Sequence, residues 1–127
     1  MIIELLKHVF QQINIDWRVY RSKAKGSASD PIPNKYIVYK LPSTSSRVHR
    51  DDTVLEITFW TRDESDTTEL ELKVEEIDRM LRNHRHIDEH HLLVFTKIGQ
   101  SEIPDPDPLI ERRELRYIIK QSERIDY

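Results

Sequence analysis

The sequence predicts an α+β fold in which one mainly antiparallel sheet carries two helices on one face. Three observations lead to this class. The chain has 127 residues, the common size of one compact domain. Apolar residues recur at helical spacing near the N-terminus and again after residue 66, and five other segments have strand character. The predicted order is α-β-β-β-α-β-β within a single domain, residues 1–127.

The N-terminal segment MIIELLKHVFQQI predicts a short amphipathic helix, with Ile3, Leu6, Val9, Phe10 and Ile13 on its apolar face. Such a helix needs a surface to pack against. The predicted strands and loops that follow are WRVYR (17–21), the turn-rich loop SKAKGSASDPIPN (22–34), YIVYKL (36–41) and the polar segment 42–52. Pro42 is expected to end the second strand, because proline lacks the N–H that a strand donates. Long mobile loops are therefore expected at about 22–34 and 42–52.

The segment TVLEITFWT (53–61) has the clearest strand pattern in the chain. Leu55, Ile57 and Phe59 alternate with Glu56 and other residues of the opposite face, as in a half-buried strand. Trp60 shares the face of Glu56, so this second face is not purely polar.

A second helix is predicted from a capping box at Asp66 and Glu69 to a terminator at Asn83. Its apolar stripe consists of Leu70, Val74, Ile77 and Leu81, and its pairs Glu75–Arg79 and Asp78–Arg82 are expected on a solvated face. Two final strands are predicted at LLVFTKI (92–98) and ERRELRYIIKQ (111–121), with an irregular proline-rich segment between them.

Composition excludes several classes of function. Cysteine is absent, which rules out disulfides, thiolate metal sites and cysteine nucleophiles. The two glycines do not cluster as a phosphate-binding loop requires. The formal charge of -3 argues against sequence-specific nucleic-acid binding, and no apolar run is long enough for a membrane span. We expect a soluble, intracellular protein without a cofactor.

The segment HRHIDEHH (84–91) is the most chemically suggestive part of the chain. Its histidines His84, His86, His90 and His91 raise the alternative of a small metal-dependent enzyme. The helical stripe ends at Leu81, however, and the segment contains no HExxH arrangement. We therefore interpret it as a polar connector and predict neither a metal site nor a catalytic residue. The serines at 43–46 with a nearby histidine and aspartates likewise lack a nucleophile elbow.

A surface for association is the better-supported prediction. A sheet face with apolar residues usually becomes buried by another layer or subunit, and two helices cover only one face. The basic residues of the two predicted loops add a positive rim. The candidate interface residues are Trp60, Glu56, Tyr36, Arg47, His49, Arg50, Lys23 and Lys25.

The succession of parts resembles the tail terminator (tail completion, tail-to-head joining) proteins of long-tailed bacteriophages. The resemblance lies in the helix IIELLKHVFQQI, the proline-preceded strand IPNKYIVYKL, and the long strand that leads into a helix at TVLEITFWTRDESDTTELELKVEEIDRML. It ends with DPDPLIERRELRYIIK, an acidic turn followed by arginines and a final strand. It covers nearly the whole chain.

The resemblance implies a non-enzymatic protein that caps the tail tube and forms the tail-to-head joining interface. It further implies a ring, typically a hexamer, whose partners are other copies of the chain, the tail tube protein and a head-completion or connector protein. A ring needs two different contact patches per subunit. The expected location is the virion at the tail–head junction, and the host cytoplasm during assembly. The alternative within the same particle is a head-closure or adaptor protein.

Overall fold

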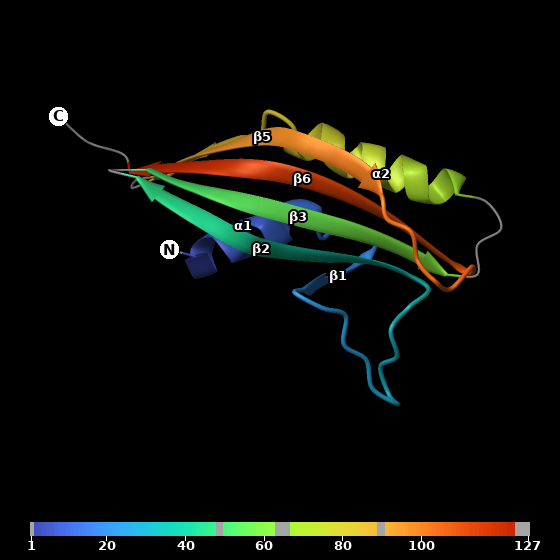
Figure 1. The fold of residues 1–127 in the computed structure, drawn as a ribbon. Coiled ribbons are helices and arrows are strands. Elements are labelled where there is room, and N and C mark those ends of the chain that lie inside the picture. Colours follow the sequence, from blue (N-terminus) through green and yellow to red (C-terminus); the bar gives the residue numbers. More distant parts are fainter. Residues whose placement is uncertain (1, 48–49, 63–66, 89–90, 124–127) are drawn as a thin grey trace.

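The structure is a computed structural model that describes residues 2–47, 50–62, 67–88 and 91–123. Its elements follow the order α1 (Ile2–Ile13), β1 (Arg18–Arg21), β2 (Lys35–Arg47), β3 (Arg50–Arg62), α2 (Thr68–Leu81), β4 (Arg85–Ile87), β5 (His91–Glu102) and β6 (Ile110–Glu123). The strands form one curled six-stranded sheet, seen in Figure 1, with the order β1-β2-β3-β6-β5-β4.

The predicted fold class is wrong. Strands make up 52% of the described residues and helices 22%, so this part of the chain is mostly β. The sheet is mixed, because β1 pairs with β2 in parallel, whereas the other neighbouring strands are antiparallel. The observed order is α-β-β-β-α-β-β-β, with β4 as the strand that was not predicted. Three residues are too few to show a strand period in the sequence, and the direction of pairing depends on distant residues.

The segment predicted as a loop at 42–52 is largely strand. Strand β2 continues to Arg47 and β3 begins at Arg50, so the two form a long hairpin. The register shifts between Lys40 and Ser43, which places Pro42 in a β-bulge. Strand β1 pairs only with residues 36–39 of β2, so Pro42 also lies on an unpaired edge of the sheet. Proline is tolerated in strands at edges and bulges, and here both conditions hold.

The core lies between one face of the sheet and both helices. Residues that alternate along the central strands, such as Leu55 and Tyr117, are fully buried with the apolar faces of α1 and α2. In α1 this face consists of Leu5, Val9 and Ile13 rather than the predicted set. Phe10 is 37% exposed, and the side chain of Ile3 lies outside the described residues. Neither described helix is long and apolar enough to cross a membrane.

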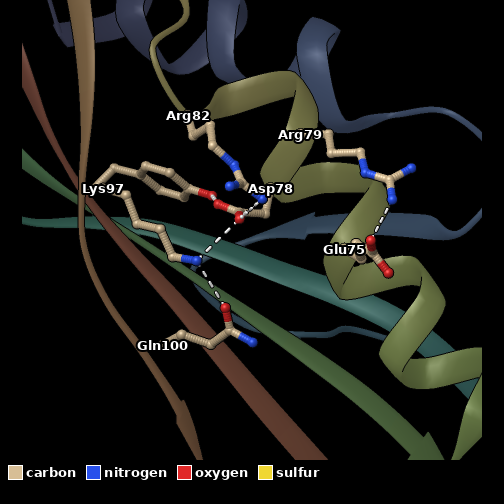
Figure 2. A network of polar contacts seen from close by, with 7 residues as sticks. Glu75, Asp78, Arg79, Arg82, Lys97 and Gln100 are labelled. Carbon is tan, nitrogen blue, oxygen red and sulfur yellow. Dashed lines mark hydrogen bonds and ion pairs between the residues drawn. The ribbon is translucent and has the colours of Figure 1, made fainter.

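A buried polar network ties α2 to the sheet. Asp78 is only 3% exposed, and its Oδ1 accepts a 2.5 Å hydrogen bond from the Tyr117 hydroxyl of β6. Its Oδ2 lies 3.0 Å from Lys97 Nζ and 2.8 Å from an Arg82 guanidinium nitrogen. Figure 2 shows Lys97 reaching from β5 to Asp78 and also to Gln100, whose Oε1 accepts a bond of 2.8 Å. The predicted solvated face is therefore wrong at Asp78, although the Glu75–Arg79 pair is exposed as expected.

The ionisation of this network follows from its burial. Burial raises the pKa of Asp78, but the hydrogen bonds from Tyr117 and Lys97 and the charges of Lys97 and Arg82 outweigh it, so the pKa lies below its usual value. Burial and the hydrogen bond to the Asp78 carboxylate raise the pKa of Tyr117. The carboxylate is thus ionised and the phenol neutral near pH 7. Because Asp78 and Tyr117 are enclosed, we assign the network to stability.

Candidate functional site

The sheet face that points away from the helices is the strongest candidate for a functional surface. Cross-strand register aligns Tyr36 with Trp60 and Arg112, and Lys40 with Glu56 and Arg116, along lines perpendicular to the strands. We call this surface the open face. It includes these alternate residues of four strands: Arg18, Tyr20, Tyr36, Val38, Lys40, Arg50, Asp52, Glu56, Thr58, Trp60, Arg112, Glu114 and Arg116.

An aromatic–arginine row of Tyr20, Tyr36, Trp60 and Arg112 crosses the open face. Tyr20 meets Tyr36 edge-on at 5.9 Å between ring centroids, and Tyr36 stacks on Trp60 at 5.6 Å with 11° between the ring planes. The Arg112 guanidinium carbon lies 4.0 Å from the centroid of the Trp60 ring. Such ring pairs and cation–π contacts contribute about 0.5–2 kcal/mol each. The four side chains therefore hold one another in place through their own contacts.

Hollows flank the stacked pair on two sides. A cavity of about 310 Å³ lies between Trp60, Tyr36 and Ile32, a residue of the 22–34 loop that is 41% exposed. A second hollow of about 350 Å³ adjoins the same pair and reaches Lys23. The 22–34 loop extends away from the sheet edge in Figure 1, and an ion pair of Arg18 with Asp30 ties it to β1. The 22–34 loop thus lines one side of the aromatic–arginine row.

A row of alternating charges lies beside the aromatic–arginine row. Glu56 lies 3.8 Å from Lys40 on one side and 3.8 Å from Arg116 on the other, and Arg116 lies 3.7 Å from Glu114. Burial and the nearby Glu56 carboxylate raise the pKa of Glu114. The alternating signs make this row complementary to a surface whose charges alternate in the opposite order.

Unpartnered polar atoms gather on the open face. Among the described residues, five buried side-chain nitrogen or oxygen atoms have no hydrogen-bond partner. All five belong to side chains of the open face: Tyr20 OH, Arg50 Nε, Asp52 Oδ1, Trp60 Nε1 and Arg112 Nε. Buried polar atoms without a partner are rare in folded proteins and cost roughly 1–3 kcal/mol each. The hydrogen-bonding capacity that the described residues leave unused is therefore concentrated on this one face.

The structure brings together only part of the predicted interface. Tyr36, Glu56 and Trp60 lie together on the open face, Arg50 lies on the same face at the start of β3, and Lys23 borders one of its hollows. Lys25 is exposed in the 22–34 loop, away from the aromatic–arginine row. Arg47 pairs with Arg50 at the end of the β2–β3 hairpin, and His49 lies outside the described residues. The sequence prediction missed Tyr20 and Arg112. Alternation gives the face of each residue within its own strand, but only the order of strands in the sheet shows that these two lie beside Tyr36 and Trp60.

The histidine-rich segment forms a different cluster from the predicted one. His84 and His86 meet His8 of α1, whereas His91 lies on the far side of Asp88, 3.7 Å from that carboxylate. His90 is outside the described residues. Within the described part of the chain, no three His, Asp or Glu side chains are placed to hold a metal ion. The contribution of His8 was missed because it is 76 residues from His84.

Comparison with known proteins gives no family for this chain. No protein-family model matches the sequence, and no curated protein is significantly similar to it.

Proposed function

We propose that this protein is a non-enzymatic assembly protein of a phage tail, which caps the tail tube and forms the tail-to-head joining interface as a ring of identical subunits. The observation that carries the proposal is the open face, on which a rigid aromatic–arginine row and five unpartnered buried polar atoms lie together. A face of this kind is expected for a subunit that is complete only in an assembly.

The occupant of the open face is a second copy of the chain. The open face meets a different patch of that copy, because a ring needs two different contact patches per subunit. The alternating charges of Lys40, Glu56, Arg116 and Glu114 favour a patch whose charges alternate in the complementary order. Trp, Tyr and Arg are the residues most often found at the energetic centre of protein interfaces. Tyr36, Trp60 and Arg112 have this composition and occupy adjoining positions.

The edges of the sheet favour contact between subunits through the open face rather than through pairing of edge strands. Strand β2 carries Pro42 and a bulge on its edge, and β5 carries a bulge between Lys97 and Gly99. Bulges and edge prolines interrupt the backbone pattern that a further strand needs. Side chains of the open face, rather than a continuous backbone ladder, therefore provide the contact between subunits.

Native mass spectrometry across a concentration series tests the subunit contact. The wild-type chain should form a closed oligomer near six subunits, and Trp60→Ala should shift it to monomer because it removes the centre of the aromatic–arginine row. Leu72→Ala is the matched control, since Leu72 is an apolar residue on α2 that is 59% exposed. A chain that stays monomeric at every concentration, including with tail tubes added, would refute the proposal.

The tail role is tested by electron microscopy of particles made without the gene. Tails from the encoding phage or prophage should then have uncontrolled length and lack heads. Normal tails of uniform length, joined to heads, would exclude the tube-capping role. Tails of uniform length without heads would instead indicate a head-closure or adaptor protein.

A further inference from the structure

Three histidines from two distant parts of the chain meet where α1 approaches the β4 edge of the sheet. His8 Nε2 lies 3.1 Å from His84 Nε2, and the two rings are nearly parallel, with 5.3 Å between centroids. The His86 ring lies 4.4 Å from the His8 ring. Phe95 of β5 meets the edge of His84 at 5.1 Å. We call His8, His84 and His86 the histidine latch.

Among the described residues, the histidine latch is one of the few polar contacts between α1 and the rest of the fold. The helix packs through the buried side chains of Leu5, Val9 and Ile13. The Tyr39 hydroxyl donates a hydrogen bond of 3.3 Å to the Leu6 carbonyl, near the upper limit for such a bond. The contact of His8 with His84 is shorter. Loss of the latch thus removes the closer of these two polar contacts.

We propose that the histidine latch is a proton-controlled switch that holds α1 on the sheet when the imidazoles of His8 and His84 are neutral and releases the helix when both become protonated. A hydrogen bond between two imidazoles requires one ring nitrogen to donate and the other to accept. When both rings are protonated, two N–H groups face each other at 3.1 Å with like charges on the rings. This state opposes docking of the helix.

The groups around the histidine latch determine whether α1 is released at low or at high pH. Burial, followed by the proximity of His86 and His84, lowers the pKa of His8 from 6.5 to about 4, while the Asp88 carboxylate acts in the opposite direction. Burial and His86 lower the pKa of His84. The adjoining cavity of about 260 Å³ is also lined by Glu4 and Lys7 of α1, by His91 and by Gln121 of β6.

The sign of the pH dependence follows from these lowered pKa values. A histidine whose pKa is lower in the docked state stabilises docking above its undocked pKa of about 6.5, and this stabilisation is lost as the pH falls toward 4. Each unit of pKa difference changes the equilibrium up to tenfold. Because His8 is only half-buried, we expect the ratio of released to docked α1 to rise about tenfold between pH 7.5 and 5.0.

Hydrogen–deuterium exchange of the full chain at pH 7.5 and 5.0 tests the proposal, with rates corrected for intrinsic exchange and a chelator in all buffers. Protection of α1 should fall about tenfold relative to α2, which is measured in the same sample. In His8→Leu the ratio between the two helices should not change with pH. His91→Gln is the matched control, because it removes a nearby histidine outside the latch and should behave like wild type.

Two results would overturn the proposal. One is an equal loss of protection in α1 and α2 of the wild-type chain. The other is an α1-specific loss that persists in His8→Leu. If His8→Leu does not fold, His8→Gln serves instead, because its amide can still contact His84 and does not titrate. No residue of the open face takes part, so the result is independent of the proposed function.

Discussion

Replacement of Asp78 by alanine is expected to be the most informative test of how the helical layer is held on the sheet. Asp78 is 3% exposed and accepts bonds from Tyr117, Lys97 and Arg82. Tyr117 is fully buried, so its hydroxyl would lose its partner without access to water, at a cost of about 1–3 kcal/mol. Lys97 and Arg82 are 31% and 51% exposed and can turn to solvent, so each adds less than about 1 kcal/mol. We expect a total loss of about 3 kcal/mol.

Urea denaturation of four chains measures this effect and assigns it to the hydroxyl. The chains are wild type, Asp78→Ala, Tyr117→Phe and the double variant. Because the two side chains share one bond, the double variant should lose about 1–2 kcal/mol less than the two single losses added together. Glu75→Ala is the matched control on the same helix, where an exposed pair with Arg79 predicts a loss below about 0.5 kcal/mol. An Asp78→Ala loss as small as that of the control, or strict additivity, would refute the assigned role.

Three further outcomes follow from the structure. Charge reversal at Arg47 and Arg50 together should weaken assembly in native mass spectrometry while the chain stays folded, because both residues lie at the end of the β2–β3 hairpin; an unfolded variant would contradict this expectation. Asn83, with φ of 62°, lies in the left-handed region in the turn after α2, so Asn83→Val should cost at least about 1 kcal/mol in urea denaturation, and an unchanged midpoint would count against this conformation. The raised pKa of Tyr117 stabilises the fold below its unfolded pKa of about 10, and this contribution is lost as the pH rises further. Wild type should therefore lose stability more steeply than Tyr117→Phe between pH 9 and 11, and parallel curves would exclude the effect.

Local periodicity in the sequence was sufficient to identify several elements. The alternation of Leu55, Ile57 and Phe59 correctly assigned β3, and the stripe from Leu70 to Leu81 correctly assigned α2. The same alternation placed Trp60 opposite the core residues of its strand, as the structure confirms. These predictions succeed because side-chain direction within one strand or helix depends only on backbone geometry.

The tertiary structure decided everything that depends on which segments become neighbours. Three features of the sheet depend on distant partners: the parallel pairing of β1, the place of β6 between β3 and β5, and the continuation of β2 through Pro42. The burial of Asp78 and the meeting of His8 with His84 have the same origin. The sequence by itself determined the faces of single elements. Packing decided which of those faces are covered, because burial and pairing are properties of contacts between segments far apart in the chain.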